Sequence, residues 1–410
     1  MKWIWLLIGC LFCYTSNAKT LIVGNKQAYT SIQLAINAAE NGDTVIVNGG
    51  NYKSGNIILN KSITLLGKNN PILDGEFKYE VISVKANNCH IKGFVIKNSG
   101  ISSIVDYAGI KLYDCERVTV ENNNIQNAFF GIYVQYGKNC IIKNNWLTAN
   151  KNTEQDNGNG IHCWKSDSLQ IIGNKIKGHR DGIYFEFVTH SIIWRNTSSA
   201  NMRYGLHFMF SNNDTYVANV FENNGAGVAV MFSNHVQMYN NYFCKNWGDA
   251  SYGILLKEIS DSAIEGNFFE QNTSGIYIEG ASRINMQRNS FINNGWALKI
   301  QASCMDIKVT ANNFKQNTFD VGTNGSLVLN EFNCNYWDKY DGYDINRDGK
   351  GDIPYRPVSM FSMIIEKNPP AMMLFRSLIT SLMDKTEKLI PSITPENLID
   401  EIPLMKPLAL

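Results

Sequence analysis

The sequence lacks net charge, long apolar runs and a leucine-rich pattern. Its 37 Lys and Arg side chains balance 36 Asp and Glu side chains, leaving a formal charge of +1 over 410 residues. This balance argues against a nucleic-acid partner, which requires a basic surface. Beyond the N-terminal segment, no run approaches the roughly 20 apolar residues of a membrane-spanning helix. Leucine is sparse and no helical period separates the apolar segments, which excludes a leucine-rich horseshoe. We therefore expect a soluble, exported protein.

The cysteines also lack a functional pattern. Two of the nine cysteines, Cys10 and Cys13, fall in an N-terminal segment that we expect to be removed. The remaining seven cannot all pair, because their number is odd: Cys89, Cys115, Cys140, Cys163, Cys244, Cys304 and Cys334. Their spacing matches neither a zinc site nor a redox pair. We expect most of them to be buried thiols that behave as small apolar side chains.

What the sequence does contain is a repeat of about 22 residues. Glycines mark it at successive steps of 22, 29, 22, 23, 22, 26 and 22 residues: Gly109, Gly131, Gly160, Gly182, Gly205, Gly227, Gly253 and Gly275. An asparagine stands fourteen positions after each glycine: Asn123, Asn145, Asn174, Asn196, Asn219, Asn241, Asn267 and Asn289. Two positions further on lies an apolar column that only Ser198 interrupts. Such fixed offsets are typical of a solenoid, in which each repeat buries its apolar face against its neighbours.

The residues after each glycine alternate in hydrophobicity. The residues one and three positions after the glycine are apolar, and those two and four positions after it are mixed, as in residues 183–186. A period of two predicts strands, and short strands between turns rich in Asn and Gly predict an all-β, right-handed parallel β-helix. We expect the glycine to be the conformationally special residue of each coil. The asparagines are expected to form a ladder of carboxamides about 4.8 Å apart, without a catalytic role.

The N-terminal region divides into a signal and a cap. Residues 1–18 combine one lysine, an apolar core and small residues before the end, which predicts a Sec-type signal peptide cleaved after Ala18. A lipoprotein signal ending at Cys10 is the alternative. Residues 19–334 are predicted to form the β-helix. A short helix that begins after Thr30-Ser31 and ends at Asn41-Gly42 would cover its open end.

Two inserted loops and two C-terminal segments depart from the repeat. The long coils carry extra residues around 151–159 and around 246–251, both between the asparagine and the next glycine, so the loops should protrude from one edge. Residues 335–366 are predicted to form a loop region rich in Asp, Asn and Gly. Residues 367–410 are predicted to form an apolar tail, with two short amphipathic helices that either pack on the coils or dock on a partner.

The C-terminal loop region contains a calcium-like motif. Asp344, Asn346, Asp348 and Asp352 place side-chain oxygens at positions 1, 3, 5 and 9 around a glycine, and are calcium candidates. An EF-hand would have glutamate at position 12, where this chain has Tyr355. The alternative is a turn whose side chains bond to its own backbone.

Candidate chemistry lies in the plus-two and plus-four columns, which face outward. No two carboxylates are adjacent in them, which argues against a polysaccharide hydrolase or lyase. His207 and Met209 share one strand face about 7 Å apart, and Met231 lies one coil beyond Met209, about 4.8 Å away. His162 lies two coils back. Imidazole and thioethers select Cu(I), so these residues are copper candidates. Alternatively they are ordinary outward side chains, with the methionines under a loop or the tail.

Ordered motifs near the C-terminus carry a family resemblance. They are Asn335-Tyr336-Trp337-Asp338, residues 342–346, residues 348–357, Leu374-Phe375-Arg376-Ser377 and Pro403-Leu404-Met405. Together with the signal peptide and the β-helix, they resemble the NosD family of periplasmic maturation proteins of nitrous oxide reductase. The resemblance implies a non-catalytic periplasmic protein that handles copper for the copper-sulfur site of that reductase. It also implies three partners besides the reductase: an ABC-type ATPase, a membrane permease and a copper-chaperone lipoprotein. A secreted carbohydrate-binding or carbohydrate-cleaving β-helix protein is the alternative.

Overall fold

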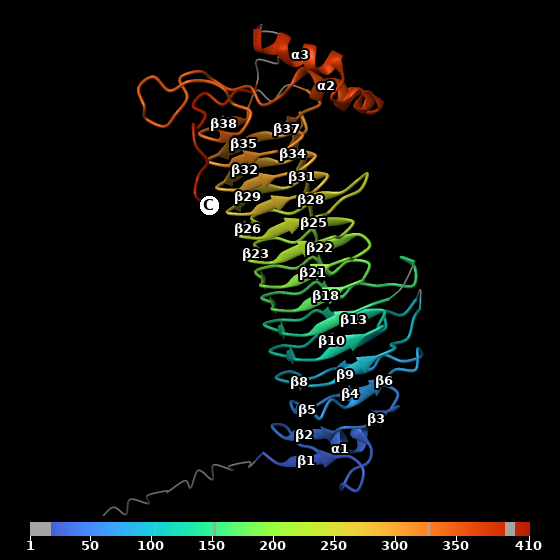
Figure 1. The fold of residues 1–410 in the computed structure, drawn as a ribbon. Helices are drawn as coiled ribbons and strands as arrows, with labels where there is room; N and C mark the ends of the chain where they lie inside the picture. The colour runs from blue at the N-terminus through green and yellow to red at the C-terminus, as the bar shows by residue number, and fades with distance from the viewer. Residues whose placement is uncertain (1–17, 103, 151–152, 326–328, 390–397) are drawn as a thin grey trace, which may run out of the picture.

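The chain winds into one long right-handed parallel β-helix with helices at both ends (Figure 1). The computed structural model describes residues 18–102, 104–150, 153–325, 329–389 and 398–410. The predicted signal peptide, apart from Ala18, lies outside these residues, as do 151–152 of the first inserted loop and 390–397 of the tail. The predicted fold class is confirmed.

Three parallel sheets of 14, 13 and 12 strands form the wall of the coil, and most coils contribute one strand to each sheet. Sheet A consists of β1 (Thr20–Val23), β2 (Thr44–Asn48), β5 (Thr64–Lys68), β8 (His90–Lys92), β11 (Thr119–Glu121), β14 (Ile141–Lys143), β17 (Gln170–Ile172), β20 (Ile192–Trp194), β23 (Thr215–Val217), β26 (Gln237–Tyr239), β29 (Ser260–Glu265), β32 (Ser282–Gln287), β35 (Met305–Thr310) and β38 (Glu331–Asn333). Sheet B consists of β3 (Asn51–Tyr52), β6 (Ile72–Asp74), β9 (Val95–Lys97), β12 (Asn124–Gln126), β15 (Trp146–Thr148), β18 (Lys175–Lys177), β21 (Thr197–Ser199), β24 (Val220–Glu222), β27 (Tyr242–Cys244), β30 (Phe268–Glu270), β33 (Ser290–Ile292), β36 (Asn313–Lys315) and β39 (Tyr336–Trp337). Sheet C consists of β4 (Ile57–Leu59), β7 (Ile82–Val84), β10 (Ala108–Tyr113), β13 (Phe130–Gln135), β16 (Ile161–Trp164), β19 (Ile183–Glu186), β22 (Tyr204–Met209), β25 (Ala226–Met231), β28 (Tyr252–Lys257), β31 (Ser274–Glu279), β34 (Trp296–Ile300) and β37 (Phe319–Gly322).

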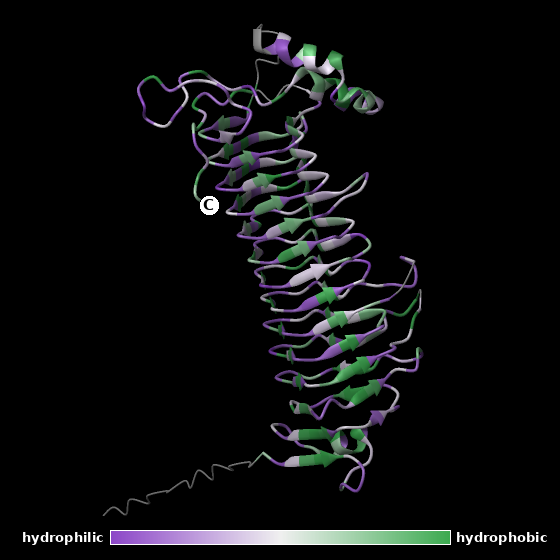
Figure 2. Cartoon of the chain, in the orientation of Figure 1, coloured by the Kyte–Doolittle hydropathy of each residue, from purple (hydrophilic) through white to green (hydrophobic). Residues whose placement is uncertain are grey.

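The inward side chains of the three sheets form one apolar core along the axis. Apolar residues gather on the strands, while the turns are mostly polar (Figure 2). The apolar column at plus sixteen becomes a row of stacked rings, with centroids 4.0 to 5.4 Å apart: Phe221, Phe243, Phe269, Phe291, Phe314 and Trp337. The repeat therefore continues past Phe314, where its sequence signal fades, because burial against the coil below is still required.

The repeated glycines are needed for close approach, not for a left-handed backbone. A Cβ atom on Gly205 would lie 2.7 Å from the carbonyl oxygen of Gly227 and 2.9 Å from Cδ1 of Phe221. Left-handed residues instead precede the ladder asparagines, as at Asn122 (φ 53°) and Asn144 (φ 54°). The prediction that the glycine is the conformationally special residue is therefore wrong. Only a residue without Cβ leaves room for the adjacent coil and the inward ring.

The asparagine ladder at plus fourteen is present and extends beyond the predicted column. Each Nδ2 donates to Oδ1 of the next coil at 3.0 or 3.1 Å, through Asn312 to Asn335. Asp400 ends the ladder. Its Oδ2 accepts from Asn335 N, Asn335 Nδ2 and Trp337 Nε1 at 3.0, 3.0 and 2.9 Å. Aspartate lacks the amide N–H₂ group through which each asparagine donates to the next coil, so the ladder of side-chain hydrogen bonds ends at Asp400.

A second ladder, which the sequence analysis missed, runs nineteen positions after the glycines. It begins where the backbone N–H of His179 donates to Asn201 Oδ1 at 3.0 Å. From Asn201 onward, each Nδ2 donates to the next Oδ1 at 2.8 to 3.5 Å, through Asn224, Asn246, Asn272 and Asn294 to Asn317. Each coil between these residues is thus fixed at two corners.

Helix α1 (Ile32–Ala38) covers the N-terminal end of the coil, as predicted. Ser31 is its N-cap, and the Gln33 side chain accepts from Ile58 N at 2.8 Å and donates to Ile58 O at 3.2 Å, so it pairs with the edge strand β4. The helix ends before the predicted Asn41-Gly42 stop. Ala39 is already extended (ψ 153°), and Lys61 Nζ donates to its carbonyl at 2.6 Å.

The C-terminal segment divides into a helical cap and a closing strand. Helix α2 (Met360–Lys367) begins inside the predicted loop region and packs Phe361 and Ile365 against Phe319 at the end of sheet C. It is followed by η1 (Pro369–Leu374) and α3 (Leu378–Leu389). The last described residues return to the coil, where Asp400 bridges Phe332 in parallel and Leu404 bridges residue 336. No helix in the described part of the chain is both long and apolar enough to cross a membrane.

The cysteines are consistent with the expected buried thiols. Among the described residues none forms a disulfide, and only Cys334 is partly exposed. Cys163 lies at the inward position of β16, where burial raises the pKa of its thiol well above the usual value. Thiols in this state are poor nucleophiles and poor metal ligands.

One buried carboxyl group should make stability depend on pH. Asp214 is inaccessible to solvent; its Oδ1 accepts from Ser191 N at 2.8 Å, and Oδ2 has no partner among the described residues. Burial raises its pKa to about 8. Since the folded state holds the proton more tightly than the unfolded state, stability should fall as pH rises from about 4 towards 8.

Asp214→Asn should remove this pH dependence, because the amide keeps the Oδ1 acceptor but cannot ionise. We expect the variant to unfold at higher denaturant concentration than the wild type at pH 8, with the difference shrinking towards pH 4. Chemical denaturation across this range measures it. A constant difference between the two proteins at all pH values would contradict the assignment.

Candidate metal centre

Sheet C carries a column of rings at the predicted outward positions. β13, β16, β19 and β22 place Tyr133, His162, Tyr184 and His207 in register. Successive ring centroids are 4.4, 4.9 and 4.9 Å apart. The four side chains therefore contact one another along the axis, with tyrosine and histidine alternating.

His207 is buried, which the strand pattern does not predict. It is 4% exposed and is covered by the rings of Tyr184 and Tyr204, at centroid distances of 4.9 and 4.7 Å. Asp181 Oδ2 lies 3.7 Å from its Nδ1. Neither ring nitrogen has a hydrogen-bond partner among the described residues. A buried imidazole whose ring nitrogens have no hydrogen-bond partner can offer a nitrogen lone pair to a soft metal ion.

Met209 and Met231 are direct neighbours on β22 and β25. Both side chains are half-buried, and Met209 shares the face of His207 because the two residues are two positions apart on one strand. The next residues, Phe210 and Phe232, stack with centroids 5.2 Å apart beside the methionines. The structure thus places His207, Met209 and Met231 on one face of sheet C, as the sequence predicted. Glu186 and Lys257 stand in register on either side of the two methionines.

His162 does not join this group. It lies two strands from His207, with the ring of Tyr184 between them. Its Nδ1 is 3.0 Å from Nδ2 of Asn159, which comes from the first inserted loop. Burial lowers the pKa of His162 to about 3, so the imidazole is neutral. A metal ion held by both methionines would be out of its reach.

Several site residues were missed by the sequence analysis. Asp181 directly precedes Gly182, and Arg203 and Tyr204 directly precede Gly205. Arg203 Nε lies 3.6 Å from Asp181 Oδ1, so its charge balances the carboxylate that faces His207. Their only sequence signal was polar or aromatic character just before the repeated glycines. In the described part of the chain, no group of three or more His, Cys, Asp and Glu converges as a metal site, so a copper site here would need the thioethers as ligands.

The outer face of sheet C offers no paired carboxylates within its columns. Glu186 stands between Trp164 and Met209, and Glu279 stands beside Lys257. Acid and base catalysis of glycoside cleavage needs two carboxyl groups across one bond. The described columns therefore lack the arrangement of that enzyme class.

The calcium motif forms the hydrogen-bonded turn. Asp344 accepts from the backbone N–H groups of Asp348 and Gly349 at 3.1 and 2.9 Å. Asn346 Oδ1 accepts from Asp348 N at 3.0 Å, and Asp352 Oδ2 accepts from Ile345 N at 2.6 Å. The oxygens predicted to bind calcium thus bind backbone donors, and no described acidic cluster forms a metal site. The calcium prediction is not supported.

Calcium should consequently leave stability unchanged. A cation would have to displace the backbone N–H groups that already occupy these oxygens, so we expect the same melting temperature in millimolar calcium and in chelator. Thermal denaturation of the wild type and of Asp348→Ala tests this. A rise on calcium addition that the variant lacks would restore the calcium site.

Two family models and several known proteins match this chain in sequence or in fold. A family model described as "Right handed beta helix region" matches residues 10–168, and one described as "Periplasmic copper-binding protein (NosD)" matches residues 147–342. The Dettilon tailspike protein is similar in fold, with a TM-score of 0.58 at 13% identity over 73% of this chain and 66% of its own. A cell surface glycoprotein of Methanothermus fervidus is 35% identical over 118 residues, and the match covers only 18% of its length.

Two relatives match over most of the chain. Both are called "Probable ABC transporter binding protein NosD". The Stutzerimonas stutzeri protein is 25% identical over 74% of this chain and 73% of its own. The Pseudomonas aeruginosa protein is 24% identical over 87% of each chain. The fold is that of a right-handed parallel β-helix protein with a column of aromatic and histidine rings on the outer wall of sheet C. The chain is thus similar to NosD proteins over most of its length.

Proposed function

We propose that this protein binds Cu(I) transiently at His207, Met209 and Met231 in the periplasm. The observation that carries the proposal is the register of Met209 with Met231, because Met209 lies two positions along the same strand face from the buried imidazole of His207, whose ring nitrogens have no hydrogen-bond partner among the described residues. Thioether sulfur and neutral imidazole are soft ligands that favour Cu(I) over hard cations. The description of the NosD family as periplasmic copper-binding supports the same metal and compartment.

Each residue has a separate role in this proposal. Asp181 favours the tautomer of His207 that is protonated at Nδ1, because its carboxylate faces that atom at 3.7 Å. Nε2 is then the metal-binding nitrogen. Met209 and Met231 supply the two sulfurs, and Phe210 and Phe232 limit water beside them. Three ligands on a half-exposed wall leave the ion open to exchange, which suits a protein that passes copper on.

Titration with Cu(I) under reducing, oxygen-free conditions tests the proposal. Competition with a chromogenic Cu(I) chelator should give one ion per chain. Ca²⁺ and Mg²⁺ should not compete, because hard cations prefer oxygen ligands. If the chelator retains all of the copper, the protein does not bind Cu(I) and the proposal fails.

We also propose that the protein is an accessory of an ABC transporter and supplies copper for the copper-sulfur site of nitrous oxide reductase. The names of the two relatives support the first part. The C-terminal apolar patch, formed by exposed side chains of η1 and α3, offers a surface for the membrane permease: Met372, Met373, Leu374, Leu378, Ile379 and Leu382. Apolar patches of this kind on a folded chain mark interaction sites.

Substitution tests the partner better than truncation, because residues after 398 close the last coil. Leu378→Ser combined with Leu382→Ser should abolish co-purification with the permease and ATPase, while Cu(I) binding stays normal. Leu329→Ser is a matched control, since Leu329 is 63% exposed outside the patch. Undiminished co-purification of the double variant would rule out this surface.

A further inference from the structure

Three phenyl rings form an exposed row on the corner that follows sheet C. Phe187, Phe210 and Phe232 each come directly after a strand, and the backbone N–H of each donates to the next coil at 3.0 to 3.2 Å, so the three residues are in register. Their rings stack with centroids 5.2 Å apart and with interplanar angles of 9° and 17°. The side chains are 44%, 40% and 41% exposed. We call these three side chains the phenyl ladder.

The coil itself does not require the phenyl ladder. The three residues have φ values of 54°, 51° and 52°, in the left-handed region that bulky side chains seldom adopt. Asp114 and Gly280 occupy the same corner position in other coils, directly after β10 and β31, so the turn forms without a ring. Backbone strain of this kind gathers at functional sites, and contiguous exposed apolar side chains mark interaction surfaces. The phenyl ladder therefore has the properties of a binding surface.

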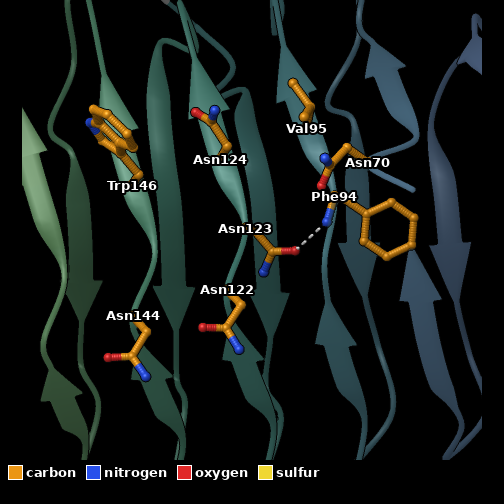
Figure 3. A pocket seen from close by; sticks show the side chains of 8 residues that line it. All are labelled: Asn70, Phe94, Val95, Asn122, Asn123, Asn124, Asn144 and Trp146. Carbon is orange, nitrogen blue, oxygen red and sulfur yellow. Dashed lines mark hydrogen bonds between the residues drawn. The ribbon is translucent and has the colours of Figure 1, made fainter. Parts of the chain in front are cut away.

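A single exposed ring elsewhere on the coil has a different setting. Trp146 on β15 is 57% exposed, but its neighbours in register are Asn124 and Lys175. The hollow beside it is lined largely by asparagines (Figure 3). Its apolar surface is thus interrupted on both sides, whereas the phenyl ladder is continuous over three consecutive coils.

Opposite charges stand at the two ends of the phenyl ladder. Lys165 occupies the same corner position one coil before Phe187, and Glu258 occupies it one coil after Phe232. Both side chains are exposed, and within the described part of the chain neither forms an ion pair. The ammonium group of Lys165 lies instead 4.7 Å from the ring centroid of Trp164. Along the axis the order is therefore one cation, three rings and one anion, at steps of one coil.

We propose that a second copy of this chain docks on the phenyl ladder in antiparallel orientation. A two-fold axis through Phe210, perpendicular to the coil, would bring Phe187 of each copy against Phe232 of the other. The same rotation would pair Lys165 with Glu258 at both ends of the interface. A parallel arrangement would place like charges opposite each other. The surface is therefore self-complementary in the antiparallel orientation, as a two-fold interface requires.

This inference does not depend on the proposed copper site. Met209 and Met231 directly precede two of the rings, so the dimer would cover them and only the monomer could exchange an ion there. Three partly exposed rings and two ion pairs form a strip smaller than the roughly 800 Å² per partner of a standard interface. We therefore expect a weak, reversible dimer with a Kd of about 10 to 100 µM.

Sedimentation equilibrium of the metal-free mature chain tests the proposal. The wild type should be monomeric at about 1 µM and largely dimeric at about 500 µM. Phe187→Ser combined with Phe232→Ser should stay monomeric at both concentrations. Trp146→Ser is the matched control, because it removes an exposed ring from another sheet, and it should associate as the wild type does. Circular dichroism should show that all of these variants fold.

Charge reversal gives an independent arm that leaves the rings in place. Lys165→Glu or Glu258→Lys alone should raise the Kd about tenfold or more, because each puts like charges opposite each other at both ends of the dimer. The two reversals combined should restore the association of the wild type, since opposite charges face each other again.

Three results would overturn the proposal. In the first, the wild type stays monomeric at about 500 µM, and a different protein is then the occupant of the phenyl ladder. In the second, the double serine variant dimerises as tightly as the wild type, so another surface forms the dimer. In the third, the combined charge reversal associates no better than either single reversal, which rules out the antiparallel pairing.

Discussion

Replacing Met209 and Met231 together by leucine is expected to weaken Cu(I) binding by about 100-fold or more. Leucine has nearly the volume of methionine, so the half-buried wall should keep its packing. What disappears is both sulfur ligands, leaving His207 as a single ligand. Competition with a chromogenic chelator measures the change in affinity.

The tail provides a matched control for this variant. Met372→Leu combined with Met373→Leu also removes two adjacent thioethers, which are exposed far along the chain from His207. This control should bind Cu(I) as the wild type does. If the two double variants lose copper equally, binding reflects exposed thioethers in general. If neither loses any, the ligands lie elsewhere. His207→Ala should reproduce part of the Met209 and Met231 effect.

Replacing Asp400 by alanine is expected to cost about 4 kcal/mol of unfolding free energy. Asp400 is inaccessible to solvent, and its Oδ2 accepts from two donors of Asn335 and from the indole N–H of Trp337. Alanine would leave these buried donors without a partner and would leave a cavity beside the end of the ring stack. Urea denaturation measures the loss.

Asp400→Asn separates the hydrogen bonds from the charge. The amide keeps one oxygen that can take the place of Oδ2, so this variant should lose much less stability than Asp400→Ala. Asp249→Ala, which changes an exposed loop aspartate, should leave the unfolding curve unchanged. An Asp400→Ala protein as stable as the wild type would show that the ladder does not need its terminal acceptor.

The sequence predicts the coil because one requirement recurs at the same place in each turn. Gly205 must lie against Gly227 and Phe221, and each ladder asparagine must reach the asparagine of the next coil. Both requirements therefore appear in the sequence as residues of one type at a nearly constant spacing. The ladder's last partner leaves no such spacing. Asp400 lies 65 residues after Asn335, and no period connects them. Periodicity therefore predicted the repeated coils, but not how the last coil is closed.

The candidate site divides in the same way. Strand register alone predicted that Met231 lies beside Met209 and that His207 lies on the same face as Met209. The structure has this arrangement. The surroundings of His207 also depend on Asp181, which lies in the turn before β19. Turn residues follow local hydrogen bonding and are not set by a period of two, so the contacts around the imidazole could not be predicted.

Because the coils stack at a fixed spacing, the distance between two side chains along the helix axis can change only in steps of one coil. A side chain on the wall can be moved relative to another only by adding or removing a whole coil of about 22 residues, which shifts it by about 4.8 Å. The inserted loop that supplies Asn159 and the second loop, which carries Trp247, lie outside the strands, so their lengths can change while this spacing stays fixed. His162 and His207 are therefore held two steps apart, and single substitutions between them can alter their chemistry but not their separation.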